Sequence, residues 1–119
     1  MYTAYVLTDK SRKEILEKFP VAYSNVVCHH ITEKFGVGSD EPIPAPPASV
    51  KVVGHVDSKT GIEGLLVEIN GSTKRPDGKL YHITLSLGQG RKPVETNDVI
   101  NRAVSCEPFD VDVTPKLLK

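Results

Sequence analysis

The alternation of apolar and polar residues along the chain predicts many β-strands and few helices. Residues 3–8 have the pattern of a first strand, and residues 50–56 and 62–70 predict a hairpin around a turn at 57–61. The alternation is cleanest over residues 80–87, where every second residue is large and apolar. Because the turns between these segments are short, we expect mainly antiparallel pairing and an α+β fold.

Helix and loop signals separate the predicted strands. The sequence Ser-Arg-Lys-Glu at 11–14 is a capping-box pattern that opens a short helix, and Pro20 should end this helix. The sequence Thr-Asn-Asp at 96–98 predicts the start of a second short helix, which is followed by a last strand over residues 109–114. Residues 36–48 are rich in glycine and proline, which favours a surface loop that connects two strands.

One nine-residue pattern, H-I-T-x-x-x-G-x-G, occurs twice in the chain. It spans residues 30–38 and again residues 82–90, so the two histidines are 52 residues apart (82 − 30). Side chains two residues apart in a strand lie on the same face, so each histidine shares a face with the threonine of its own copy. Two such strands facing each other present two imidazoles and two hydroxyls to one cleft. These candidate catalytic residues are His30, Thr32, His82 and Thr84.

The polar faces of both predicted strands continue beyond the His-x-Thr pairs. Alternation over residues 25–34 places Cys28, His30 and Lys34 on one face of the first strand. Ser86 is the equivalent of Lys34 in the second copy. Both residues are candidates for substrate binding, as an extension of an anion site, and both are equally typical of ordinary solvated strand positions.

Paired imidazoles and hydroxyls suit acid and base chemistry on an anionic centre such as phosphate. Cleavage of a phosphodiester needs one group that takes a proton from the attacking oxygen and another that gives a proton to the leaving oxygen. An imidazole titrates close to neutral pH, so one histidine can be the base while the other is the acid. Threonine hydroxyls beside them can donate hydrogen bonds to the non-bridging oxygens, where charge is held in the transition state.

Length and charge narrow the class of ligand. A chain of 119 residues is most simply one domain over 1–119, with a core of modest size. Fifteen basic residues balance fifteen acidic ones, so no global positive field favours binding to a long nucleic acid. A nucleotide or the end of an RNA strand is a better fit as a partner. The sequence says nothing of the oligomeric state.

The remaining composition predicts a cytoplasmic protein. The first ten residues lack the pattern of a signal peptide, and no apolar run approaches the roughly 20 residues that span a bilayer, so we expect no membrane partner. Cys28 and Cys106 lack the spacing of metal ligands and are expected to stay reduced. No metal and no other cofactor is expected.

The paired H-x-T motifs resemble those of the 2H phosphoesterase superfamily, which includes LigT-like cyclic phosphodiesterases and the phosphodiesterase domains of tRNA ligases. The resemblance covers roughly residues 29–90. It implies a compact bilobal fold in which two mainly antiparallel sheets surround a cleft. It also implies that His30 and His82 are the acid and base and that Thr32 and Thr84 bind phosphate. The implied activity is metal-independent hydrolysis of a cyclic phosphate, carried by an RNA end, a nucleotide or a cyclic oligonucleotide.

Two other functions compete with this one. A metalloenzyme of the vicinal-oxygen-chelate kind would use imidazoles and carboxylates as metal ligands, but no glutamate stands in the place that a paired module of that family requires. Glu63, Glu68 and Glu95 could separately complete a metal site with the histidines. The position of His30 after a predicted strand and helix argues against that family. A protein that only binds a phosphorylated ligand would keep the cleft without catalysis, yet binding alone needs no proton donor and acceptor. His29 and His55 are each interpreted as structural, since a single histidine on a strand is usually a satisfied residue.

Overall fold

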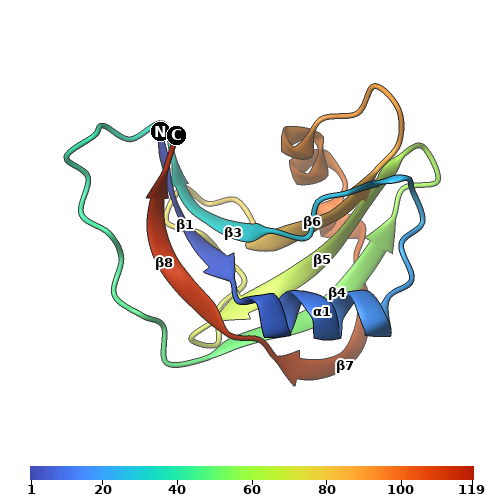
Figure 1. Cartoon of the computed structure of the whole chain (residues 1–119), viewed down its shortest axis with the longest axis horizontal. Helices are drawn as coiled ribbons and strands as arrows, with labels where there is room; N and C mark the ends of the chain where they lie inside the picture. Colours follow the sequence, from blue (N-terminus) through green and yellow to red (C-terminus); the bar gives the residue numbers. More distant parts are fainter.

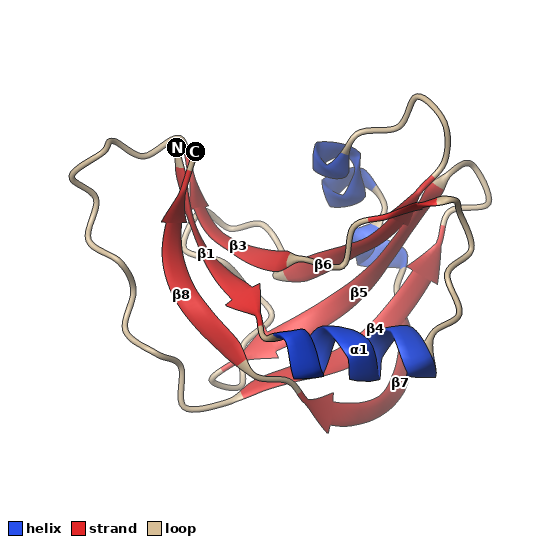
Figure 2. Ribbon diagram, in the orientation of Figure 1, coloured by secondary structure: helices blue, strands red, loops and turns tan.

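The strands of the protein form one curled antiparallel sheet that carries one α-helix and two short 3₁₀ helices (Figures 1 and 2). The computed structural model describes all residues, 1–119. In chain order the elements are β1 (Tyr2–Leu7), α1 (Asp9–Lys18), β2 (Asn25–Val26), β3 (His30–Phe35), β4 (Val50–Asp57), β5 (Ile62–Ile69), β6 (His82–Leu87), η1 (Pro93–Asp98), η2 (Ile100–Arg102), β7 (Val104–Asp110) and β8 (Val113–Leu118). The α+β class and the antiparallel pairing are confirmed.

The order of the strands explains why the sheet curls. It runs β7-β4-β5-β6-β3-β1-β8, with β2 paired to β6. β7 and β8 are the two edge strands, yet only residues 111 and 112 separate them in the chain. The sheet must therefore bend until its edges meet, and β7 and β8 join at one end of the molecule (Figure 1). At the other end the two termini lie together, because Tyr2 pairs with Leu118 across β1 and β8 (Figure 1).

Two apolar clusters lie on opposite faces of the sheet. The larger has 14 buried residues and packs under α1, whose Ile15 is fully buried in it. The smaller has five buried residues and lies under η1 and η2. Its members are Val56, Ile62, Leu87, Val99 and Ile100. Burial of apolar surface is the main force that holds helices against a sheet, so these clusters fix the position of α1 on one face and of η1 and η2 on the other.

The first helix begins earlier than its capping pattern predicted. Thr8 is the N-cap, and its hydroxyl accepts a hydrogen bond from the backbone N–H of Ser11. Ser11, the predicted cap, is buried inside the first turn, and its own hydroxyl accepts from the backbone N–H of Asp112. The predicted end is confirmed, since the helix stops at Lys18, before Pro20.

Three other expectations differ from the structure. The second helix is a pair of 3₁₀ turns that begins at Pro93, because proline suits the first turn of a helix. The last predicted strand is two strands, β7 and β8, separated by the sharp turn at Val111 and Asp112. Two separate sheets were expected, whereas backbone hydrogen bonds join all eight strands in one sheet.

None of the helices combines the length and the apolar character needed to cross a membrane.

Candidate active site

The two H-x-T strands are neighbours at the middle of the sheet. β3 and β6 run antiparallel, and they pair at a single position, Ile31 with Ile83. Each isoleucine is the central residue of its motif and points into the larger core. In an antiparallel pair with this register, the first residue of one motif stands across from the third residue of the other. Pairing is limited to this one position, and the two motifs then line opposite sides of the space between the strands.

A backbone irregularity at Cys28 sets this register. β2 pairs with β6 through Val26 and Ser86, and the backbone N–H of Cys28 still donates to the carbonyl of Thr84. Cys28 then takes a φ of 41°, in the left-handed region that disfavours residues with a side chain. The predicted continuous strand over 25–34 is therefore broken. Cys28 is turned into the core instead of sharing the face of His30, which corrects the sequence interpretation.

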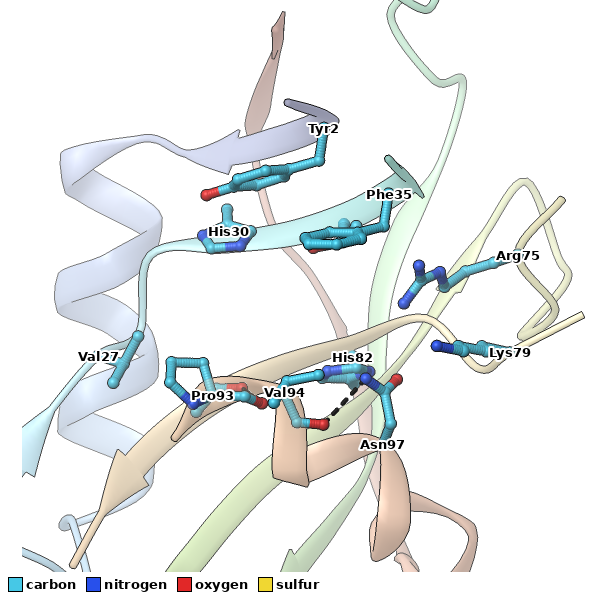
Figure 3. Close-up of a pocket in the computed structure, with 12 residues that line it drawn as sticks. Tyr2, Val27, His30, Phe35, Arg75, Lys79, His82, Pro93, Val94 and Asn97 are labelled. Atoms are coloured by element: carbon cyan, nitrogen blue, oxygen red, sulfur yellow. Dashed lines mark hydrogen bonds between the residues drawn. The ribbon is translucent and has the colours of Figure 1, made fainter. Parts of the chain in front are cut away.

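A cavity of about 230 Å³ opens between the two motif strands and η1 (Figure 3). His30 lies on one wall and His82 on the other, and the threonines of both motifs line the cavity with them (Figure 3). The other lining residues are Tyr2, Val27, Phe35, Arg75, Lys79, Pro93, Val94 and Asn97. All four predicted catalytic residues, His30, Thr32, His82 and Thr84, are thus gathered around one space.

The two predicted substrate-binding residues, Lys34 and Ser86, do not line this cavity. The register of β3 against β1 shifts between the partners of Thr3 and Ala4, which leaves Glu33 as an extra residue. Such a β-bulge reverses the alternation of faces, so Lys34 turns away and pairs with Glu41 at 3.5 Å. A second bulge in β6 buries Ser86 on the α1 side of the sheet, where its hydroxyl donates to Glu63.

His82 is held in one tautomer by the backbone. Its Nδ1 lies 3.0 Å from the carbonyl oxygen of Leu80. A carbonyl only accepts, so Nδ1 carries a proton and Nε2 is left for a ligand. Burial of His82 lowers its pKa below the usual 6.5, the Leu80 carbonyl opposes this shift, and the charges of Arg75 and Lys79 lower the pKa further.

His30 contacts a second histidine that the sequence interpretation had treated as structural. Nδ1 of His30 and Nδ1 of His29 are 3.0 Å apart, so one ring donates to the other. The Tyr2 ring covers His30 with its centroid 5.3 Å from that of the imidazole. Burial, followed by the proximity of His29 and His82, lowers the pKa of His30 from 6.5 to about 4. In the free protein at neutral pH His30 is therefore a neutral base.

The Thr84 hydroxyl has a partner that its sequence position did not reveal. Thr84 Oγ1 lies 2.8 Å from the hydroxyl oxygen of Thr96 in η1. When Thr96 donates, the single proton of the Thr84 hydroxyl points to the Pro93 carbonyl at 3.4 Å, a long hydrogen bond that an anion in the cavity could replace. Gly64 permits this approach of η1, since a Cβ atom there would come within 2.9 Å of the Thr96 methyl group. Thr96 is thus a positioning residue.

The protein has only two buried side-chain polar atoms without a hydrogen-bond partner, and both belong to residues of this cavity. They are Nε of Arg75 and Oδ1 of Asn97. The amide nitrogen of Asn97 donates to the carbonyl of Val94, so its Oδ1 is the free acceptor (Figure 3). Leaving buried polar groups unpaired costs stability, which native proteins mostly avoid outside functional sites. One orphaned donor and one orphaned acceptor here indicate a ligand site.

Several wall residues escaped the sequence analysis because no local pattern marks them. Tyr2 and Phe35 are direct partners across β1 and β3, and their rings stack at 6.0 Å between centroids. Phe35 is 74% exposed, which is unusual for so large an apolar side chain. Arg75 and Lys79 come from the turn before β6. The only sequence feature that could have indicated them is the presence of two basic residues, Arg75 and Lys79, shortly before the second motif.

The carboxylates considered as metal ligands lie elsewhere. Glu63 faces the α1 side and binds Ser86 and His55, and Glu95 binds Arg91 at the surface. Nowhere does the fold gather three or more histidine, cysteine or carboxylate side chains in an arrangement suited to a metal ion. A search with protein-family models finds no match to this chain, and no curated protein or solved structure is significantly similar to it.

Proposed function

We propose that the protein is a phosphodiesterase of the 2H type that hydrolyses a cyclic phosphate by acid and base catalysis from two histidines. The observation that carries the proposal is the meeting of the two H-x-T motifs around one cavity, with His30 and His82 on facing walls (Figure 3). The motifs are 52 residues apart (82 − 30) in sequence, so their convergence is a property of the fold. Two unrelated surface histidines would not be expected to line the same cavity as Thr32 and Thr84.

The cavity supplies each role in the reaction. A water oxygen attacks phosphorus while a neutral imidazole takes its proton. The bond from phosphorus to the 2′ or 3′ oxygen breaks, and the second imidazole gives its proton to that leaving oxygen. The product is a phosphate monoester, which is a nucleoside monophosphate when the substrate is a cyclic mononucleotide and a phosphorylated strand end when the substrate is RNA. Thr32 and Thr84 donate hydrogen bonds to the non-bridging oxygens, whose negative charge is held during the transfer.

Local contacts favour His30 as the base and His82 as the acid. His30 has the pKa lowered to about 4, and its Nδ1 is paired with another imidazole. His82 has its Nδ1 proton fixed on the Leu80 carbonyl, a contact that stabilises the charged ring. A bound phosphate adds negative charge beside His82 and offsets the effect of Arg75 and Lys79. Binding of the substrate therefore favours the protonated form of His82, which is the form that acts as the acid.

The bilobal arrangement of 2H enzymes has a counterpart in this sheet, and we include it in the proposal. β8, β1 and β3 form one wing, and β6, β5, β4 and β7 form the other. The wings meet where Ile31 pairs with Ile83, and each wing contributes one histidine and one threonine. The cavity then corresponds to the cleft between two lobes, although both lobes belong to a continuous sheet.

A panel of phosphodiesters tests the proposal. The purified protein is incubated with 2′,3′-cyclic mononucleotides, cyclic dinucleotides and oligoribonucleotides with cyclic phosphate ends, and the products are identified by mass spectrometry. We expect hydrolysis of at least one cyclic phosphate, and survival of that activity after exhaustive treatment with EDTA, because side chains fill all roles. No turnover across the panel contradicts the proposal. Activity that is lost with a stoichiometric metal and restored with it points to the metalloenzyme reading instead.

The pH dependence of kcat/KM is a second test. The reaction needs one neutral and one charged imidazole, so the rate falls at low pH, where both are charged, and at high pH, where both are neutral. Both pKa values are lowered from 6.5, that of His30 to about 4. We therefore expect a bell-shaped profile with its maximum below pH 6.5. A maximum above pH 7 argues against this pair.

His29 provides a matched variant for the pH measurement. Its proximity is one cause of the low pKa of His30. His29→Gln removes an exposed imidazole and leaves both motif histidines in place. The acid limb of the profile should move to higher pH in this variant, whereas the limb assigned to His82 should stay. An unchanged acid limb would show that this limb does not belong to His30.

A further inference from the structure

Arg75 and Lys79 face each other across a tight hairpin at one end of the cavity (Figure 3). The backbone N–H of Arg75 donates to the carbonyl of Lys79 at 2.8 Å, and the next pair outward, Lys74 with Leu80, is a β-bridge. Gly78 allows the turn, with a φ of 85°. Both side chains extend toward the cavity (Figure 3). The hairpin therefore holds two cations side by side next to His82.

The positive charges of Arg75 and Lys79 repel each other at this separation unless an anion binds between them. Like charges directly opposite each other in antiparallel strands destabilise the pair. Asp77 accepts from one guanidinium nitrogen of Arg75 at 2.7 Å, but Nε of Arg75 is buried without a partner. Lys79 forms no ion pair with any carboxylate of the protein. The Arg75 side chain is only 3% exposed, so water gives it little compensation.

We infer that Arg75 and Lys79 form a second anion subsite, which binds a phosphate other than the one that is cleaved. The inference rests on the proposed function, in which the phosphate that is cleaved lies between His30 and His82. It adds the class of substrate that the protein prefers. The preferred substrate is then a nucleotide with two phosphates, as in an RNA end, a dinucleotide or a cyclic oligonucleotide, rather than a cyclic mononucleotide with one. Planar guanidinium N–H groups and a lysine ammonium are the groups that bind phosphate best.

The wall between the two subsites suits a nucleoside. Phe35 lies on the same wall as His30, on the side toward Arg75 (Figure 3). Its ring is stacked on Tyr2 and is 74% exposed, so one face is open for a base or a sugar. Aromatic faces bind bases without regard to sequence. A nucleoside that joins two phosphates would pass over this ring.

Binding of non-reacting ligands tests the subsite without any need for turnover. Isothermal titration compares adenosine 3′-monophosphate with adenosine 3′,5′-bisphosphate, which differ by one phosphate. We expect the wild-type protein to bind the bisphosphate about 10- to 100-fold more tightly, the range for hydrogen bonds that involve charged groups. The advantage should shrink as salt concentration rises, because it is electrostatic.

Lys79→Gln is the decisive variant, because Lys79 is exposed and its loss should not affect folding. We expect it to reduce the advantage of the bisphosphate to less than about 3-fold. Lys74→Gln is the matched control, since Lys74 is an exposed lysine of the same hairpin that does not line the cavity, and it should keep the full advantage. Arg75→Lys keeps the charge and removes the unpaired Nε, so it should lose part of the advantage.

The outcomes separate the two proposals. Equal affinity for the two ligands overturns the second subsite, whether or not the protein hydrolyses cyclic phosphates. An advantage that survives Lys79→Gln unchanged overturns it as well. A bisphosphate preference that depends on Lys79, in a protein that hydrolyses no member of the phosphodiester panel, supports the subsite and contradicts the phosphodiesterase.

Discussion

Replacing either His30 or His82 with alanine is expected to lower kcat for a cyclic phosphate by about 10²- to 10⁴-fold. Each variant removes one of the two proton-transfer groups, while the other imidazole and both threonines remain in the cavity. The two losses should not add in the double variant, because the acid and the base act in the same step. Steady-state rates of the three variants, with circular dichroism to confirm folding, provide the measurement.

Two further variants show whether the loss of activity in the histidine variants comes from lost chemistry or from a disturbed fold. Thr32→Val keeps the shape of the side chain and removes one hydrogen bond to phosphate, so its loss should be smaller, on the order of 10- to 10³-fold. His55→Gln is the control, because His55 is a strand histidine that binds Glu63 and does not line the cavity. It should retain near wild-type activity. If His55→Gln is as inactive as the motif variants, the losses report on folding rather than chemistry.

Glu63→Ala is expected to cause the largest loss of stability of any single change outside the apolar core. Glu63 is 2% exposed. Its carboxylate accepts from the backbone N–H of Ala22 at 2.9 Å and from the hydroxyl of Ser86 at 2.6 Å, and lies 2.8 Å from His55. Alanine removes all three contacts and leaves the buried Ser86 hydroxyl without its acceptor, which should lower the free energy of unfolding by about 2–4 kcal/mol.

Thermal unfolding measures this effect. A loss of this size corresponds to a melting temperature lower by roughly 10 °C for a chain of this length. Glu17→Ala removes an exposed carboxylate from α1, and it should change the melting temperature little. Equal melting temperatures for the two variants would contradict the role of Glu63 as the residue that fastens the segment at Ala22 to the sheet.

The strands and the faces on which the motif residues lie could be predicted from the sequence because both depend on local alternation. The spacing of two residues between histidine and threonine places them on one face of any strand, and β3 and β6 preserve this over the motifs themselves. The isoleucine between them is apolar in both copies and is buried at the junction. The repeat therefore encoded the faces of His30, Thr32, His82 and Thr84 without information about distant contacts.

The errors lie where one extra residue changes the faces. The bulge at Glu33 turned Lys34 away from the cavity, and the bulge in β6 sent Ser86 to the opposite face. A bulge depends on how the partner strand is packed, so it cannot be predicted from the residues of the bulged strand alone. Arg75, Lys79 and Phe35 were missed for a different reason. They reach the cavity through the path of the hairpin and through pairing with β1, which are properties of the tertiary structure.

The pairing of Tyr2 with Leu118 has a practical consequence for work with this protein. Tyr2 forms part of the cavity wall and covers His30, and Leu118 lies beside Tyr2 in the neighbouring strand. A purification tag or a fluorescent protein fused at either end would emerge at the mouth of the cavity and compete with a ligand for space. Labels for binding experiments are better placed near residues 46–48, which belong to no strand or helix and lie beside the β7–β8 turn at the other end of the molecule.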